Sequence, residues 1–322
     1  MRKTSHDSAW YLNRYSMMED NAFRSGFVAL VGEPNVGKST LINSFIGQKV
    51  AIVSPKAQTT RHRILGILNR DAMQIVFTDT PGFCVKGNAL HQTMRRIAGH
   101  AAADADLTVL IVALRKDMAL SEHEHILAQE GRRNDGKLIV ALNKIDRVKG
   151  KEALLPWFEM IEKTFQPERI VPISGLTGDG LDALLSEISA LMPVSDPLFP
   201  LDMHTDQAER VLCAELIREQ LLLGLEQEVP HGAVVLIDEF EDLRDDVKKP
   251  MCRLYGRIIV ERESQKGIVV GKEGKKIKSI STKARKGMEE MLGAPVFLRL
   301  EVSVDKNWTQ SEAALRRYGF ES

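Results

Sequence analysis

Residues 32–39 read GEPNVGKS and match the phosphate-binding pattern G-x-x-x-x-G-K-[ST]. An apolar run, FVALV at 27–31, precedes this stretch, and a helical pattern at 38–46 follows it. In this strand–loop–helix setting the glycines let backbone N–H groups turn toward a phosphate, and the helix adds the positive end of its dipole. A plain glycine turn with an exposed lysine is the minor alternative. The predicted contacts are Gly32, Glu33, Pro34, Asn35, Val36, Gly37, Lys38, Ser39 and Thr40.

Buried strands and helices alternate along the first two thirds of the chain. Further apolar runs lie at 74–78, 107–113, 138–142 and 169–173. Further helical patterns lie at 120–132, 151–165 and 180–191. This alternation predicts an α/β P-loop domain, with a mostly parallel sheet and helices on both faces.

A second motif selects the base. Asp146 ends the tetrapeptide NKID after the apolar run 138–142, and its carboxylate can accept two hydrogen bonds from guanine N1–H and the 2-amino group. Adenine has no donor at either position, so a site built in this way rejects it by a factor of ~10⁴ or more. The residues SGL at 174–176 are expected to place backbone beside guanine O6. The predicted base contacts are Asn143, Lys144, Ile145, Asp146, Ser174, Gly175 and Leu176.

Two further segments are expected to respond to the γ-phosphate. The sequence DTPG at 79–82 follows the run 74–78, so Asp79 would hold Mg²⁺ through water and the Gly82 N–H would sense the phosphate. In QTTRH at 58–62, Thr60 is the better candidate for closing on the cation. The predicted metal set is Ser39, Thr60 and Asp79. The nucleotide contacts of the DTPG segment are Asp79, Thr80, Pro81, Gly82 and Phe83.

Catalysis needs a substitute for a water-positioning glutamine. Ras-like enzymes carry that glutamine directly after the DxxG glycine, where this chain has Phe83. Asn35 resembles the asparagine that coordinates K⁺ in cation-activated GTPases, and such an ion would neutralise developing charge. The sequence therefore predicts faster turnover in potassium than in sodium. The predicted catalytic residues are Lys38, Thr60, Asn35 and Gly82.

The remaining third of the chain has a different organisation. Three prolines in 192–200 mark a break, and a helix is expected from about 206 to 223. Strand-like runs at 233–237 and 252–261 follow. A helix pair punctuated by glycines then leads to a last strand at 296–304. The order of helix, strand, strand, helix–loop–helix and strand is that of the type II KH fold.

Basic residues concentrate in the expected helix pair. Residues 266–286 hold eight basic side chains and one acidic one, in a chain of zero net charge. A solvated helix face is the usual meaning of such a run. The loop GKEG at 271–274 favours nucleic acid instead, because a G-x-x-G loop between two helices clamps an RNA backbone in KH domains. The predicted RNA contacts are Lys266, Ile268, Val269, Val270, Gly271, Lys272, Glu273, Gly274, Lys275, Lys276, Ile277 and Lys278.

Taken together, these motifs resemble the Era family of bacterial ribosome-assembly GTPases, within the TrmE-Era-EngA-like superfamily. The resemblance rests on GEPNVGKSTL, QTTRHR, DTPG, NKID, VERESQKGIVVGKEG and a C-terminal KNW, in register over 26–308. It implies GTP hydrolysis with Mg²⁺, and single-stranded binding to the 3′ end of 16S rRNA in the 30S subunit. It also implies that GTP permits this binding and that RNA stimulates hydrolysis.

The resemblance also sets the expected boundaries and location. The predicted parts are an N-terminal extension at 1–25, a GTPase domain at 26–194, a linker at 195–204, a type II KH domain at 205–308 and a C-terminal tail at 309–322. The extension is expected to be flexible. We expect a monomer in the cytoplasm that associates peripherally with the cytoplasmic face of the inner membrane.

Other functions fit fewer of these features. A tRNA-modifying or other cation-activated GTPase would share the nucleotide motifs but not a single C-terminal KH domain. A passive RNA chaperone would not need the intact Mg²⁺ set, and a P-loop kinase would not need NKID. Cys84, Cys213 and Cys252 fit no zinc spacing, and their odd number argues against a disulfide scaffold. The longest apolar stretch, at 107–114, is too short to span a membrane.

Overall fold

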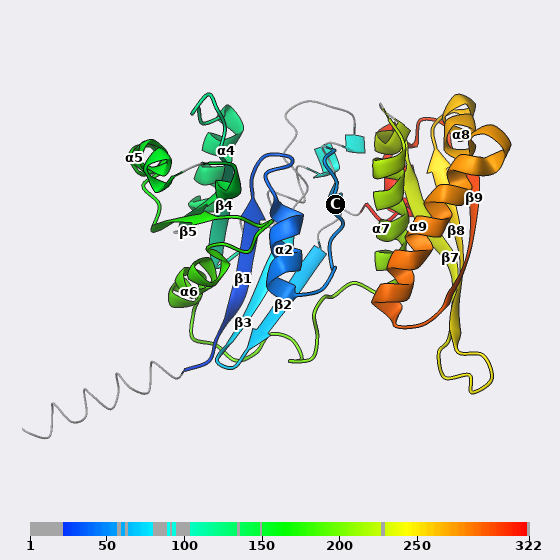
Figure 1. Cartoon of the computed structure of the whole chain (residues 1–322), viewed down its shortest axis with the longest axis horizontal. Helices are drawn as coiled ribbons and strands as arrows, with labels where there is room; N and C mark the ends of the chain where they lie inside the picture. Colours follow the sequence, from blue (N-terminus) through cyan, green and yellow to red (C-terminus); the bar gives the residue numbers. More distant parts are fainter. Residues whose placement is uncertain are drawn as a thin grey trace, which may run out of the picture.

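The computed structural model places two domains side by side, and α7 (Glu209–Gly224) of the second domain faces the first (Figure 1). The structure describes residues 22–56, 59–61, 64–79, 89–90, 92–94, 104–133, 136–148, 150–226 and 229–320. No helix in these ranges is both long and apolar enough to cross a membrane.

A six-stranded sheet forms the first domain, in the order β2-β3-β1-β4-β5-β6. Every neighbouring pair is parallel except β2 and β3. Helices α2 and α6 pack on one face, and α4 and α5 on the other (Figure 1). The elements are β1 (Arg24–Val31), α2 (Lys38–Ile46), β2 (Ile64–Arg70), β3 (Met73–Asp79), β4 (Leu107–Ala113), α4 (Glu122–Gly131), β5 (Lys137–Asn143), α5 (Leu155–Phe165), β6 (Arg169–Ile173) and α6 (Leu181–Leu191).

The predicted strands and helices of this domain are confirmed, with two changes. β1 begins at Arg24, so the domain starts inside the predicted extension 1–25, of which residues 1–21 lie outside the described part. The sequence reasoning also missed β2, which reads ILGILNR. β2 forms an antiparallel hairpin with β3 across the turn 71–72, and a strict alternation of strands and helices does not anticipate a hairpin.

The predicted linker, 195–204, runs along the sheet and is fixed to it. The Gln74 side chain on β3 accepts hydrogen bonds from the backbone N–H groups of Leu198 and Phe199, at 2.7 and 2.8 Å. Phe199 also meets Phe27 edge to face, with ring centroids 6.4 Å apart. These contacts restrict the freedom that a loose linker would give the second domain.

The second domain has the predicted order of elements. They are α7, η4 (Val229–Gly232), β7 (Val234–Leu243), β8 (Met251–Val260), α8 (Glu263–Val270), η5 (Lys272–Gly274), α9 (Lys275–Leu292) and β9 (Val296–Val304). β7 pairs antiparallel with β8, and β8 pairs parallel with β9. Cys213 and Cys252 are free, buried thiols in the core between helices and sheet, while Cys84 lies outside the described residues.

The predicted C-terminal tail, 309–322, is largely part of this domain. Residues 308–310 form η6 (Trp308–Gln310), and α10 (Glu312–Arg317) follows. Leu315, Tyr318 and Phe320 are buried beside Trp308 and the strands β7 and β8. These side chains cover a second face of the sheet formed by β7, β8 and β9. The second domain therefore extends beyond residue 308.

Candidate nucleotide site and RNA-binding surface

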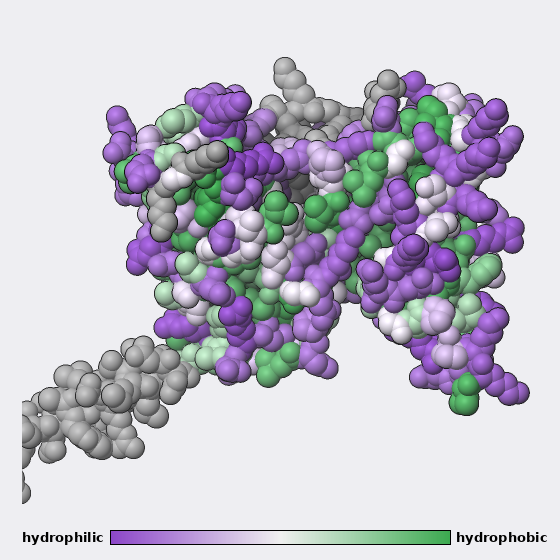
Figure 2. Space-filling model, in the orientation of Figure 1, coloured by the Kyte–Doolittle hydropathy of each residue, from purple (hydrophilic) through white to green (hydrophobic). Residues whose placement is uncertain are grey.

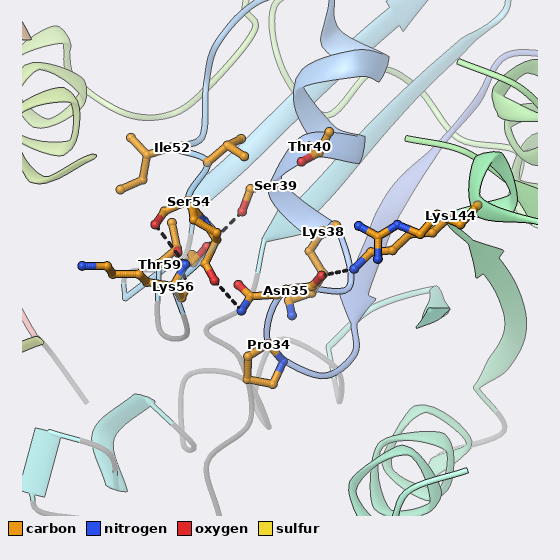
Figure 3. A pocket seen from close by; sticks show the side chains of 15 residues that line it. Pro34, Asn35, Lys38, Ser39, Thr40, Ile52, Ser54, Lys56, Thr59 and Lys144 are labelled. Carbon is orange, nitrogen blue, oxygen red and sulfur yellow. Dashed lines mark hydrogen bonds between the residues drawn. The ribbon is translucent and has the colours of Figure 1, made fainter. Parts of the chain in front are cut away.

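The phosphate loop connects β1 to α2 at the carboxyl edge of the sheet. Lys38 points back into the loop and donates to the carbonyls of Gly32 and Glu33, at 2.9 Å each. Gly37 has a φ of 111°, and a Cβ there would lie 2.5 Å from Asn143 Nδ2, so only glycine fits. The loop lines a cavity of about 340 Å³ (Figure 3), within the size range of small-molecule sites.

The three predicted metal residues meet at one point of this site. Asp79 Oδ2 accepts hydrogen bonds from the hydroxyls of Ser39 and Thr60, at 2.8 Å each, and the two hydroxyl oxygens are 3.1 Å apart. Asp79 Oδ1 is buried without a hydrogen-bond partner in the described structure. Burial raises the pKa of Asp79, while Lys38 and the two hydroxyls lower it in part.

This donor set fits a magnesium ion. Two hydroxyls and one carboxylate are the oxygen ligands that Mg²⁺ prefers, and the buried, unpartnered oxygen of Asp79 leaves a charged acceptor for the water of such an ion. Among the described residues no group of three or more His, Cys, Asp and Glu could hold a metal.

Asn143 joins the base-binding loops to the phosphate loop. Its Nδ2 donates to the Val36 carbonyl at 2.6 Å, and its Oδ1 accepts from the Gly175 N–H at 3.0 Å. Ser174 donates to Asp146 Oδ1 at 2.6 Å and so fixes the carboxylate predicted to read guanine. Asn143 thus braces both loops, and the buried Val36 contributes its backbone carbonyl.

The other residues predicted to contact the base lie in different surroundings. Lys144 Nζ donates to the Asn35 carbonyl at 2.6 Å, which ties NKID to the phosphate loop from a second side. Burial, and next the charge of Arg147, lowers the pKa of Lys144. The contact predicted between backbone at 174–176 and guanine O6 stays a prediction. Ile145 is half-buried against the domain core, and the Leu176 side chain points into solvent.

The structure adds residues that carry no motif. The segment 52–56 lines the cavity opposite the phosphate loop, and the Pro55 carbonyl accepts from Asn35 Nδ2 at 2.8 Å (Figure 3). Arg147 lines it from the NKID side. Their only sequence signal is nearness to the motifs.

A series of hydrogen-bonded side chains also supports the phosphate loop. Arg115 donates to Glu33 Oε2 at 2.9 Å and to the buried Glu124 Oε2 at 2.6 Å. The Glu33 side chain therefore supports the loop, and its backbone carbonyl is what faces Lys38. Arg115 lies two residues after the end of β4, and that position near a strand's carboxyl end was the signal that could have found it.

The structure describes only the first residue of the DTPG motif. Asp79 ends β3, but Thr80, Pro81, Gly82 and Phe83 lie outside the described residues. The predicted γ-phosphate contact of Gly82 and the absence of a water-positioning side chain at Phe83 remain predictions.

The GKEG loop joins α8 to α9 as the sequence predicted. Gly271 has a φ of 70°, and a Cβ there would lie 2.6 Å from Lys276 Cβ. Glu273 also has a positive φ, of 54°, and Gly274 caps the start of α9. The turn places the N-terminus of α9, with the positive end of its dipole, beside the loop, where a phosphate could bind.

The residues predicted to contact RNA differ in how far their side chains are exposed to solvent. Lys272, Lys275, Lys276 and Lys278 are exposed, and Figure 2 shows hydrophilic residues gathered over α9. Ile268 is 43% exposed and offers an apolar surface beside the loop. Lys266, Val270 and Ile277 are half-buried. The prediction that Val269 contacts RNA is wrong. Its side chain is fully buried in the core, so it supports α8 and cannot touch RNA.

Comparison with known proteins gives both domains a family. Residues 27–144 match the family described as 50S ribosome-binding GTPase, and residues 228–309 match the KH domain family. The chain is 40% identical to GTPase Era of Syntrophus aciditrophicus over 299 residues, which cover 92% of this chain and 95% of that protein. The chain belongs to the Era family.

Solved Era structures agree over the whole fold. An Aquifex aeolicus Era variant bound to GDP·AlF₄⁻ superposes with a TM-score of 0.88 at 37% identity, covering 93% of this chain and all of the other. Era in complex with MgGDPNP and nucleotides 1506–1542 of 16S ribosomal RNA superposes with a TM-score of 0.87, at the same identity and coverage. This Era-family chain is a GTP hydrolase with a C-terminal KH domain.

Proposed function

We propose that this GTPase binds the 3′ end of 16S rRNA through its KH domain and acts in assembly and maturation of the 30S subunit. The observation that carries the proposal is the G-x-x-G loop at 271–274, set between two helices and surrounded by exposed lysines. An Era structure of the same fold holds nucleotides 1506–1542 of 16S ribosomal RNA.

The residues on the phosphate side of the nucleotide site would have separate roles. Lys38 is positioned to donate to the β- and γ-phosphates once a nucleotide replaces its present carbonyl partners. Ser39 and Thr60 would hold Mg²⁺ directly and Asp79 through water. When bound, the ion neutralises charge on the phosphate oxygens. Thr60 reaches this point because the segment 59–61 lies against the site, where the residue would sense the γ-phosphate.

A potassium ion is part of the proposal. Asn35 has a φ of 63° and lies beside the Pro55 carbonyl, so an amide and a backbone carbonyl group converge next to the phosphate loop. An ion that takes the Asn35 amide oxygen as a ligand would oppose charge as it develops at the phosphates. Turnover in potassium buffer should exceed turnover in sodium buffer, and equal rates would remove the ion from the mechanism.

RNA binding needs charge and a tight turn more than a deep pocket. The loop 271–274 makes the tight turn, and Lys272 and Lys275 beside it extend into solvent. A single strand would lay its phosphates on the loop and rest bases against apolar surface such as Ile268. Double-stranded RNA lacks the free bases that this arrangement would contact.

GTP turnover with and without RNA tests the proposal. The purified full chain is assayed in potassium buffer with a short RNA matching the 3′ end of 16S rRNA, and with a scrambled RNA of equal length. Stimulation by the first RNA alone is the expected result. Turnover that ignores both RNAs, together with equal binding of both, would overturn the proposed target.

Peripheral association with the cytoplasmic face of the inner membrane and a monomeric state are further proposals, supported by the motif resemblance. Cell fractionation and light scattering of the purified chain test them. Recovery of the protein only in the fraction without membranes, or a stable dimer, would contradict them.

A further inference from the structure

Thr60 and Arg61 are consecutive residues that bind opposite domains. The Thr60 hydroxyl donates to Asp79 at 2.8 Å, inside the nucleotide site. Arg61, which is 1% exposed, donates from Nη1 to the Ala233 carbonyl at 2.6 Å and from Nη2 to the His231 carbonyl at 2.7 Å. Both carbonyls belong to the KH domain, where η4 leads into β7. The residue that would contact the metal is therefore one peptide bond from an interdomain anchor.

Helix α7 holds the same segment on the other side of Thr60. Arg218 donates to the Thr59 carbonyl. Its guanidinium is fixed by Glu215, which accepts at 2.8 Å from Nε and at 2.6 Å from Nη2. In Figure 1 the segment after α2 runs between α2 and α7. The KH domain thus binds both neighbours of Thr60 in the chain.

Two arginines are buried in this interface. Arg61 and Arg218 are both buried, and Arg218 pairs with the carboxylate of Glu215. Burial, and next the charge of Arg218, lowers the pKa of Arg61 to about 9, and Glu215 raises it in part. Taking a guanidinium out of water costs free energy, and the hydrogen bonds of Arg61 to the two KH-domain carbonyls offset part of that cost.

The carbonyls that Arg61 binds belong to a turn that also touches α8. A Cβ built on Gly232 would lie 3.2 Å from Glu261 Oε2 and 3.6 Å from Gln265 Nε2. Gln265 lies on α8, which leads directly into the GKEG loop. Trp308 Nε1 donates to the Gly232 carbonyl at 3.1 Å and fixes the turn from behind. A continuous set of contacts therefore links the RNA-binding loop to Arg61.

The chain beyond Asp79 rests on the KH domain as well. Leu90 and Met94, each 1% exposed, are buried in one apolar cluster with Trp308 and Phe320. The KH domain accordingly contacts the chain on both sides of the predicted cation site: before it through 59–61, and after it through this cluster.

We propose that Arg61 is a positioning residue through which the KH domain holds Thr60 closed on the nucleotide. RNA bound at α8 and its loop would change the position of the 229–233 turn, and Arg61 transmits that change to Thr60. This inference rests on the proposed function, because it assumes that Thr60 acts with GTP and that RNA binds the GKEG loop. It makes the rate of GTP turnover depend on two backbone carbonyls of the other domain.

The test compares three variants of the full chain. Arg61→Met keeps the length and the apolar stem of the side chain but removes its donors, and Arg61→Lys keeps the charge and one point of contact. Lys49→Ala is the matched control, since Lys49 pairs with Glu219 at 2.6 Å across the same interface but lies far in sequence from Thr60. Steady-state GTP turnover, with and without the 16S 3′-end RNA, is measured together with GDP affinity and the melting temperature.

We expect Arg61→Met to lower kcat about 10-fold and to lose stimulation by RNA, while GDP affinity stays within about 2-fold. GDP affinity is spared because GDP lacks the γ-phosphate that Thr60 senses. Arg61→Lys should recover part of kcat, and Lys49→Ala should match the wild type. Should Arg61→Met not fold, Arg61→Lys carries the same comparison of kcat with GDP affinity.

Two results would overturn the inference. One is wild-type kcat and RNA stimulation in Arg61→Met. The other is a loss of kcat that is matched by equal losses of GDP affinity and melting temperature, which a merely structural role would produce. If RNA does not stimulate the wild type, the proposed RNA function fails, and the basal kcat and GDP affinity of Arg61→Met still decide the role of Arg61.

Discussion

The nucleotide site and the RNA-binding surface are built in opposite ways. In the nucleotide site, hydrogen bonds fix the decisive side chains: Asn143 bonds the backbone of Val36 and Gly175, and Ser174 bonds Asp146. On the RNA surface the decisive lysines extend into solvent, and the one ion pair within the loop joins Lys275 to Glu273. The first site holds its side chains through hydrogen bonds within the protein, whereas the second supplies charge around a fixed turn.

The difference follows from what each ligand demands. Choosing guanine over adenine requires polar groups at fixed positions with no water to replace a missing partner. Attracting a phosphate backbone requires positive potential, which acts at a distance and tolerates side-chain motion. We therefore expect single-atom changes to be severe in the first site and graded on the second.

The largest effect should come from Asp146→Asn. The amide replaces one carboxylate oxygen with a donor, so it can no longer accept both guanine hydrogen bonds. We expect GTP and GDP affinity to fall by a factor of ~10⁴. Affinity for xanthosine nucleotides, whose 2-oxo group needs a donor, should rise. Displacement of a fluorescent GDP analogue measures both, and equal losses for both bases would show that the fold, and not recognition, had changed.

Gly37→Ala should have the next largest effect. The new Cβ would lie 2.5 Å from Asn143 Nδ2 at a φ of 111°, so loop and base site must both shift. We expect GDP affinity, measured by titration calorimetry, to fall about 100-fold.

Gly175→Ala is the matched control for Gly37→Ala. A Cβ on Gly175 would make ordinary contact with Thr40 Cγ2, at 3.8 Å. GDP affinity should change less than about 2-fold. A large loss in this control would mean that the loop 174–176 is less tolerant than its geometry indicates.

The RNA surface should respond in smaller, salt-dependent steps. We expect Lys272→Ala with Lys275→Ala to weaken binding of the 16S 3′-end RNA about 10-fold, and to reduce the slope of log affinity against log salt by about 1.4. Basal GTP turnover should not change. Fluorescence anisotropy at several potassium chloride concentrations measures both quantities.

Two other lysines of the same domain provide a control that removes the same amount of positive charge. Lys248 and Lys249 are exposed in the β7–β8 hairpin, which Figure 1 shows at the opposite end of the domain from α8. Replacing both with alanine should leave affinity and salt slope unaltered. Equal effects of the two pairs would reduce the RNA surface to general electrostatic attraction.

The smallest effect on RNA binding should come from the apolar residues of α8. Ile268→Ala removes exposed surface, so RNA affinity should fall a few-fold and the free energy of unfolding should change by less than about 0.5 kcal/mol. Val269→Ala removes buried volume and should lower the free energy of unfolding by about 2 kcal/mol. Urea unfolding separates the two. A stability loss in Ile268→Ala that equals the loss in Val269→Ala would refute this assignment of the two side chains.

The sequence determined the fold class, most of the order of elements and the motifs that line the nucleotide site. These features are local: a glycine at a positive φ, an apolar run, and a short motif each impose their structure on a few neighbours. For that reason GEPNVGKS, NKID and GKEG could be assigned before any coordinates. The same local logic missed β2, an edge strand that is specified by its partner β3.

Only the tertiary structure decided which of these residues support one another. Val269 and Ile268 are neighbours with similar side chains, and the packing of α8 alone puts one in the core and the other in solvent. Arg61 lies in QTTRHR without an assigned contact, yet it binds the backbone of residues 170 and 172 positions away. Such contacts depend on how two separately folded domains meet, and no local periodicity encodes that arrangement.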